Sequence, residues 1–301
     1  MIRNTFTHFL AQKQAEGITQ RTLDNYLYSL QVFLADNGLD DTAEEAVLTQ
    51  EFITKWVLYM QALGTRTVAS INHYLRDMKV YCNFLHTFYN RPELRIRLLK
   101  QPQVIKPRYS ELDLEALLEA PRATDGYHIW RTWLIISIML ATGARIGSVC
   151  RLKKEDINQN TITFTHTKNG NKLVLPVSKQ LYCNVLRFNS LFETDSEYLL
   201  ISAKEGNELT PTGAYQALQD YCISRGVKCL GWHSFRHTFA YMAYKKGVDL
   251  VTLQTYLQHS SIELTRHYIG ALGATDLPNF EVPLDCLCKA KVKKHIIKKK
   301  V

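Results

Sequence analysis

The first hundred residues of this chain carry apolar side chains at helical spacing, and glycines divide them into four segments. In the clearest segment, apolar residues recur every three or four positions from Leu23 to Phe33, between Thr19, which can cap a helix, and Gly38. The four predicted helices cover about residues 6–17, 19–38, 50–63 and 67–89. No strand-like alternation interrupts them, so we predict an all-helical domain over residues 1–100.

A proline-containing segment ends this helical region. Residues 101–109 (QPQVIKPRY) contain two prolines and no apolar periodicity. Proline lacks a backbone N–H and disfavours helix in the residue before it. We therefore predict an extended linker at residues 101–109, with the boundary between two domains there.

Helix signals also dominate after the linker. Ser110 and Asp113 match a capping box at the start of a helix, and a buried helix is predicted at about residues 129–141. From Thr212 onward the pattern is again helical, and it is broken at Gly226, Gly247 and His259.

Strand signals are confined to the middle of this second region. Residues 161–165 and 172–177 alternate like strands, and the Asn169-Gly170 dipeptide between them is a strong hairpin signal. A further strand is predicted near residues 198–202. We therefore predict a mainly α protein, whose second domain, residues 110–272, is mixed α/β with a small antiparallel sheet.

The positive charge of the chain is unevenly distributed. Residues 289–301 hold seven of the 37 basic residues and no acid, so the remaining chain has 30 basic against 28 acidic residues. Between Arg66 and Arg108, nine basic residues stand against Asp77 and Glu93. This stretch fits either a surface that follows a phosphate backbone or a solvated helix face, and charge alone favours neither.

The longest apolar stretch, residues 133–141, is interrupted by Ser137 and is too short to span a bilayer. No charged-then-apolar signal segment opens the chain. The seven cysteines are scattered and include no C-x-x-C pair. These features favour a cytoplasmic protein without a membrane partner.

Four short segments carry side chains suited to phosphate chemistry. They are Thr142–Ile146 (TGARI), Lys168 at the predicted hairpin tip, His233–Ala240 (HSFRHTFA), and Leu257–Ser261 (LQHSS) followed by Tyr268. The guanidiniums of Arg145 and Arg236 can clamp the oxygens of a phosphodiester through paired donors, and His259 can add a third donor. Tyr268 supplies a hydroxyl nucleophile, with Tyr256 as the alternative.

The reaction also needs proton transfer, for which Lys168 and His233 are the candidates. Lys168 can give a proton to the leaving 5′ oxygen, with Lys172 as the competitor. His233 titrates near neutrality and can take the tyrosine proton or polarise the phosphate. His237 is interpreted as structural, because it follows Arg236 directly and so lies on a different helix face. No acidic cluster indicates a metal site, and this chemistry needs neither a metal nor a cofactor.

In order and spacing, these segments resemble the motif boxes of the tyrosine recombinase (phage integrase) family. His259 lies 23 residues after Arg236, and Tyr268 lies nine residues after His259, as in the family pattern. The four helices before the linker resemble the family's core-binding domain. The resemblance covers roughly residues 4–272 and implies the six site residues Arg145, Lys168, His233, Arg236, His259 and Tyr268.

The resemblance also implies the architecture. Residues 1–100 are expected to form a SAM-like four-helix core-binding domain that contacts DNA. Residues 110–272 are expected to form a catalytic domain with the family's DNA breaking-rejoining fold, followed by a tail, residues 273–301, with a basic end. No arm-binding segment precedes the core-binding helices, which is more similar to Xer-like or transposon-type recombinases than to the larger phage integrases.

In function, the resemblance implies a site-specific DNA recombinase, such as an integrase of a mobile element, that acts in the cytoplasm at the nucleoid. Cleavage passes through a 3′-phosphotyrosine intermediate, and strands exchange through a Holliday junction. The expected partners are double-stranded DNA with an inverted-repeat site and three further copies of the chain, as a homotetramer on two sites.

Two departures and two alternatives accompany this interpretation. The family usually has an acid where this chain has Ser148, and a glycine where it has Gln258. Neither change removes a reacting group, so we expect an active enzyme. The alternatives are a type IB topoisomerase, which shares the chemistry, and a non-catalytic DNA-binding relative.

Overall fold

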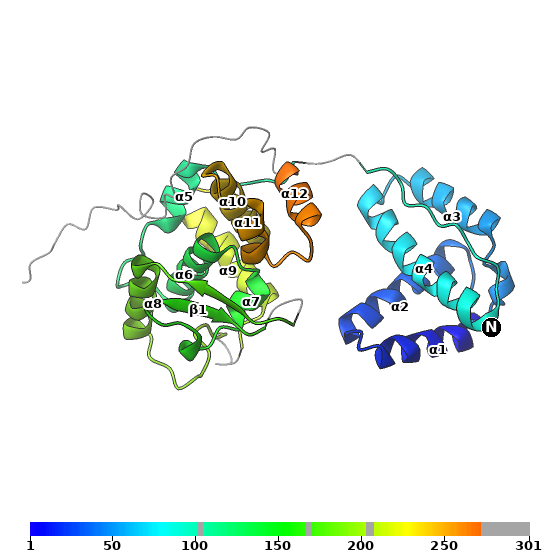
Figure 1. Cartoon of the computed structure of the whole chain (residues 1–301), viewed down its shortest axis with the longest axis horizontal. Helices are drawn as coiled ribbons and strands as arrows, with labels where there is room; N and C mark the ends of the chain where they lie inside the picture. Colours follow the sequence, from blue (N-terminus) through cyan, green and yellow to red (C-terminus); the bar gives the residue numbers. More distant parts are fainter. Residues whose placement is uncertain (102–104, 167–169, 203–207, 272–301) are drawn as a thin grey trace, which may run out of the picture. The chain divides into compact units, whose positions relative to one another are not determined.

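The computed structural model describes residues 1–101, 105–166, 170–202 and 208–271 (Figure 1). The chain divides into two compact units, Met1–Gln103 and Val104–Val301. Both are mainly helical, and the second also contains a small antiparallel sheet. The predicted mainly α fold is therefore confirmed. Within these ranges, no helix combines the length and the apolar character that crossing a membrane requires.

Within residues 1–101, the glycine-divided pattern produces the four predicted helices and one short 3-10 turn. They are α1 (Ile2–Ala15), α2 (Gln20–Asp36), η1 (Glu45–Val47), α3 (Gln50–Ala62) and α4 (Val68–Tyr89). The α4 helix packs against the other three, and its buried Tyr81 contacts Phe6 and Phe9 of α1. Thr19 stands at the N-cap of α2 as expected, but its hydroxyl contacts the Thr22 hydroxyl (3.1 Å) and caps no backbone amide.

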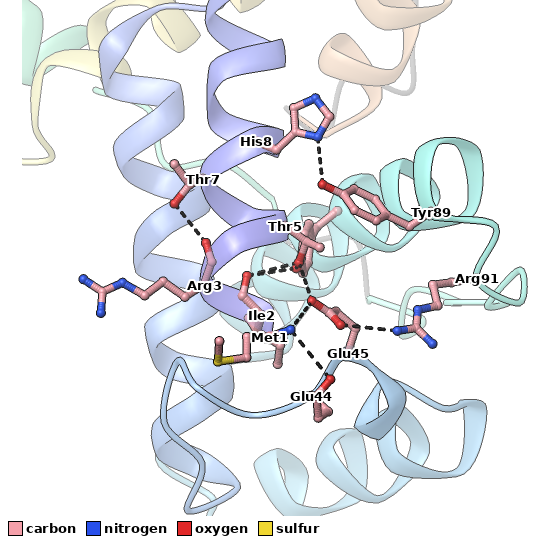
Figure 2. Close-up of polar contacts among 11 residues, drawn as sticks. Met1, Ile2, Arg3, Thr5, Thr7, His8, Glu44, Glu45, Tyr89 and Arg91 are labelled. Carbon is pink, nitrogen blue, oxygen red and sulfur yellow. Dashed lines mark hydrogen bonds and ion pairs between the residues drawn. The ribbon is translucent and has the colours of Figure 1, made fainter.

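Glu45 is a buried carboxylate that joins separate parts of this first unit (Figure 2). It accepts a hydrogen bond from the Thr5 hydroxyl (3.2 Å) and pairs with the Met1 amino group (2.8 Å) and the Arg91 guanidinium (3.3 Å). These contacts connect the start of α1 to η1 and to the segment after α4. A buried charge requires such partners, so this cluster is part of the stability of the unit.

The second unit is built around the α6 helix. Its elements are α5 (Glu111–Leu118), α6 (Tyr127–Thr142), α7 (Ile146–Cys150), η2 (Lys154–Asp156), β1 (Thr161–Phe164), β2 (Leu173–Pro176), α8 (Lys179–Leu191), α9 (Pro211–Ser224), α10 (Trp232–Lys245), α11 (Leu250–Leu257) and α12 (Ile262–Gly270). Every residue from Trp130 to Leu140 is buried, and α5, α8, α9 and α10 pack around α6. The capping box is confirmed. The Ser110 amide donates to the Asp113 carboxylate (2.9 Å), and the Asp113 amide donates to the Ser110 hydroxyl (3.1 Å).

The sheet consists of the two predicted strands, paired antiparallel with Thr161 opposite Pro176 and Phe164 opposite Leu173. Gly170 adopts the left-handed conformation (φ 73°) that a tight hairpin turn favours. Asn169, the other residue of the predicted turn, lies outside the described residues.

The strand predicted near residues 198–202 is wrong. Ile201 makes an isolated bridge with Glu208, and Tyr198 makes one with Lys153. The chain turns into η2 directly after Lys153, so the pairing cannot extend into a ladder. The apolar pattern that indicated a strand reflects the burial of Leu200 in the core.

Gly143 ends α6 at the point where α10 packs against it. The residue is left-handed (φ 66°), and a Cβ built there would lie 2.3 Å from Cδ1 of Phe239. Backbone conformation and space therefore both require glycine. This close approach brings the end of α6 next to the middle of α10, where the predicted site residues lie.

Candidate active site

Five of the six predicted site residues belong to the part of the chain that the structure describes, and Lys168 lies outside it. Arg145 follows the Gly143 turn, Arg236 comes from α10, His259 follows α11, and Tyr268 lies in α12. These side chains converge, because α10, α11 and α12 pack against one another and α10 packs on α6.

Arg236 is buried (4% exposed) and joins three segments. Its Nη1 donates to the Gly143 carbonyl (2.8 Å), and its Nη2 donates to the Leu257 carbonyl at the end of α11. Nη2 also lies 3.4 Å from Nε2 of His259. Burial, followed by the charge of Arg145, lowers the pKa of Arg236 to about 10, so it stays charged near neutrality.

Arg145 presents a donor that has no partner within the described part of the chain. It is the N-cap residue of α7 and is half-buried, and its Nη1 bonds to no atom of the described residues. Burial lowers the pKa of Arg145, and Tyr268 acts in the opposite direction. Ser148, which stands where the family usually has an acid, supplies no carboxylate to neutralise it. A buried guanidinium N–H without a partner is rare, and an anionic oxygen fits its geometry.

His259 is held by a residue that the sequence argument missed. Its Nδ1 lies 3.0 Å from Oγ1 of Thr265, which is fully buried in α12. Burial, then the charges of Arg236 and Arg145, lowers the pKa of His259 to about 4. The ring is therefore neutral near pH 7, and Thr265 fixes its orientation.

Tyr268 lies between two histidine rings. The ring centroids of Tyr268 and His259 are 5.1 Å apart, and Oη of Tyr268 lies 2.5 Å from Nδ1 of His237. Burial raises the pKa of Tyr268 to about 12, whereas Arg236 and Arg145 act to lower it. The free enzyme therefore carries a protonated phenol beside two guanidiniums.

The interpretation of His237 as a structural residue is incomplete, because its ring contacts the predicted nucleophile. His233 and His237 are four residues apart in α10, and their ring centroids are 6.5 Å apart. Residues four apart share a helix face, and this spacing is the sequence signal that could have identified His237. His233 is in part open to solvent, and partial desolvation of its ring, followed by the charges of Arg236 and Arg145, lowers its pKa.

The competing residues are Lys172 and Tyr256. Lys172 is exposed just before β2. Tyr256 stacks on Phe239 with ring centroids 5.8 Å apart, and burial raises the pKa of its phenol. Tyr256 is therefore a packing residue in this structure.

Gln258 occupies the left-handed C-cap of α11 (φ 49°, ψ 48°), a conformation that glycine adopts without a steric cost. We predict that Gln258→Gly raises the free energy of unfolding by about 0.5–1 kcal/mol. The gain is the difference between a left-handed cost of about 1–2 kcal/mol and the backbone entropy cost of glycine, about 0.5–1 kcal/mol. Urea unfolding measures the change. Gln258→Ala, which keeps a Cβ, is the matched control, and an equal gain in that variant would contradict the backbone explanation.

Comparison with known proteins yields a consistent set of similarities. Residues 108–273 match the phage integrase family. The chain is 28% identical to tyrosine recombinase XerA of Pyrococcus furiosus over 265 residues, covering 86% of this chain and 87% of the relative. It is 25% identical to tyrosine recombinase XerC of Staphylococcus carnosus over 276 residues, covering 89% and 91%.

Solved structures share the fold at lower identity. A lambda integrase tetramer bound to a Holliday junction superposes with a TM-score of 0.70 at 17% identity, covering 93% of this chain and 80% of that one. The Tn1549 transposon integrase in complex with transposon right end DNA gives a TM-score of 0.68 at 16% identity, covering 89% and 94%.

Proposed function

Because the chain belongs to the phage integrase family, it is a site-specific DNA recombinase that cleaves and rejoins strands, and we propose that Tyr268 is its nucleophile. One observation carries this assignment. The Tyr268 hydroxyl lies in a buried, positively charged site beside Arg236, near Arg145, whose Nη1 has no partner in the described residues. An incoming phosphate would supply that partner.

The proposed reaction is a transesterification. Oη of Tyr268 forms a bond to the scissile phosphorus as the bond from phosphorus to the 5′ oxygen breaks. The phenol loses its proton, and the 5′ oxygen gains one. The 3′-phosphotyrosine conserves the energy of the phosphodiester, so a 5′ hydroxyl can reverse the step and rejoin DNA without an energy source.

Hydrogen-bond donors from the arginines and histidines of the site would stabilise charge on the two non-bridging oxygens. Two of the five N–H donors of Arg236 are directed to carbonyls, which leaves three for other acceptors. Arg145 adds Nη1, which has no partner among the described residues, and His259 would donate from Nε2, beside Arg236, in the tautomer that carries its proton there. His233 is exposed on the same helix as Arg236 and is proposed to hold a phosphate oxygen.

Lys168 is proposed to protonate the leaving 5′ oxygen. We expect Lys168→Ala to slow cleavage by about 10²–10⁴, the usual contribution of a general acid. A substrate with sulfur in place of the bridging 5′ oxygen has a leaving group that needs no proton, so it should restore much of the rate. Cleavage of both substrates is compared with Lys172→Ala as the matched control. If Lys172→Ala is impaired on normal DNA and rescued by the sulfur substrate, while Lys168→Ala cleaves normal DNA at the wild-type rate, the general acid is Lys172.

We infer that the substrate is duplex DNA carrying inverted half-sites, bound by four copies of the chain on two sites. The solved relatives include a lambda integrase dimer on a core site and a tetramer on a Holliday junction. In this arrangement residues 1–100 are the core-binding domain, residues 101–109 the linker, and residues 110–272 the catalytic domain. We place the protein in the cytoplasm at the nucleoid, where such DNA lies.

A plasmid assay tests this function against the topoisomerase alternative. Target duplexes are first selected by affinity from a random-sequence library, and two copies of the selected site are placed on one plasmid. We expect products with exchanged flanking sequences, formed without ATP. Relaxation of a supercoiled plasmid that lacks the site, with no exchange between sites, would instead indicate a topoisomerase.

A further inference from the structure

The proton of the Tyr268 phenol needs an acceptor when Oη attacks phosphorus. Among the described residues, His237 hydrogen-bonds this hydroxyl, and the Arg236 guanidinium acts on it electrostatically. Arginine has no acceptor atom and keeps its charge at the pH of the cell, so it cannot take the proton. His237 is placed to do so, because its Nδ1 lies 2.5 Å from Oη and the ring centroids are 5.2 Å apart.

The other histidines of the site are less well placed. His259 meets Tyr268 edge-on, while its Nδ1 contacts Thr265 and its Nε2 faces Arg236. His233 makes no hydrogen bond to the Tyr268 hydroxyl within the described residues, and its ring centroid lies 6.5 Å from that of His237. His233 and His259 are therefore placed in the phosphate-contacting role, and His237 contacts the nucleophile.

His237 has the protonation state that a base requires. Burial, then the charges of His233, Lys106 and Arg236, lowers the pKa of His237 to about 4, so the ring is neutral near pH 7. Tyr268 is protonated under the same conditions. In the neutral tautomer with its proton on Nε2, the short contact is a phenol O–H donating to an unprotonated Nδ1.

We propose that His237 is the general base of the cleavage step, receiving the Tyr268 proton on Nδ1 and returning it during rejoining. In cleavage the O–H bond of Tyr268 breaks, its electron pair forms the O–P bond, and the 5′ oxygen leaves with the P–O electron pair. His237 becomes an imidazolium. In rejoining, the imidazolium gives the proton back as the tyrosine oxygen leaves. The proposal rests on Tyr268 being the nucleophile.

DNA binding would strengthen this base. Lys106 and Arg236 disfavour the imidazolium in the free enzyme. A bound phosphate carries a negative charge that offsets these two cations, so the pKa of His237 rises when the substrate arrives. Without DNA the phenol stays protonated, and Tyr268 remains unreactive.

The first test replaces His237 with asparagine. Oδ1 of Asn takes the place of Nδ1 and still accepts a hydrogen bond from Tyr268, but an amide does not hold a proton. We expect His237→Asn to bind target DNA normally and to form the covalent complex about 10²–10⁴ times more slowly. His267→Asn, an exposed histidine next to Tyr268, is the matched control and should cleave at the normal rate. Cleavage by His237→Asn at the wild-type rate would reduce His237 to a hydrogen-bonding partner and overturn the proposal.

The second test changes the acidity of the nucleophile. Fluorinated tyrosine at position 268 has a more acidic phenol that depends less on a base. The loss of cleavage rate in His237→Asn should therefore shrink at least tenfold with fluorotyrosine. In a second variant, His237→Ala, imidazole added to the solution should increase the cleavage rate by replacing the missing base. An unchanged defect together with no response to imidazole would overturn the proposal.

The two proposals fail differently. A covalent complex formed by Tyr268→Phe would contradict the assignment of the nucleophile itself. An inactive Tyr268→Phe together with a fully active His237→Asn would contradict the role of His237 alone.

Discussion

Arg236→Lys and Arg145→Lys each slow DNA cleavage by about 10²–10³, the cost of losing one donor that stabilises transition-state charge. Lysine keeps the positive charge but lacks the planar pair of donors that matches two phosphate oxygens. Affinity for the target duplex changes little, because many other contacts along the phosphate backbone contribute to it.

The two variants differ in stability. Arg236 donates to the carbonyls of Gly143 and Leu257 from a buried position, and one ammonium cannot reproduce both contacts. A buried carbonyl left unpaired costs about 1–3 kcal/mol, so Arg236→Lys also lowers the free energy of unfolding by about that amount. Nη1 of Arg145 bonds to nothing in the described ranges, so Arg145→Lys should lose cleavage with little loss of stability.

Three measurements on each variant separate these effects: single-turnover cleavage at saturating DNA, binding of the selected duplex, and urea unfolding. Arg145→Lys, which should keep its stability, is the control that separates loss of cleavage from loss of stability in Arg236→Lys. Losses of binding as large as the losses of cleavage would contradict the assignment of both arginines to the reacting phosphate.

Most of the secondary structure could be predicted because local signals agree with one another. Glycine breaks and apolar spacing indicate the helices of the first unit, and the Ser110–Asp113 pair marks the start of α5. The strand predicted near residues 198–202 failed because Tyr198 and Ile201 make only isolated bridges, and Lys153, the partner of Tyr198, belongs to a segment that immediately turns into η2. Strand formation depends on the partner strand, which a local pattern does not contain.

The site could be predicted in part. The spacing between Arg236, His259 and Tyr268 names residues that the structure places together, and helix packing explains why. The contact between Tyr268 and His237 was missed, because His237 was compared only with its neighbour Arg236 and not with His233, four residues earlier. Thr265 was missed because a buried threonine has no sequence signature.

Tyr268→Phe should abolish the covalent protein–DNA complex while leaving DNA binding intact. Phenylalanine keeps the ring that packs near His259 and removes only Oη, the atom that attacks phosphorus. The lost hydrogen bond to His237 should change the free energy of unfolding by only about 1 kcal/mol. Tyr256→Phe is the matched control, because Tyr256 packs on Phe239 and is expected to retain cleavage.

The most direct measurement traps the covalent intermediate on a nicked duplex. After cleavage, the short fragment that carries the 5′ hydroxyl dissociates, so rejoining cannot occur. The trapped protein is digested, and the peptide that carries the DNA is identified by mass spectrometry. We predict that the DNA is attached to the peptide containing Tyr268 and that Tyr268→Phe yields no adduct. An adduct on any other residue, or one that persists in Tyr268→Phe, would contradict the central assignment.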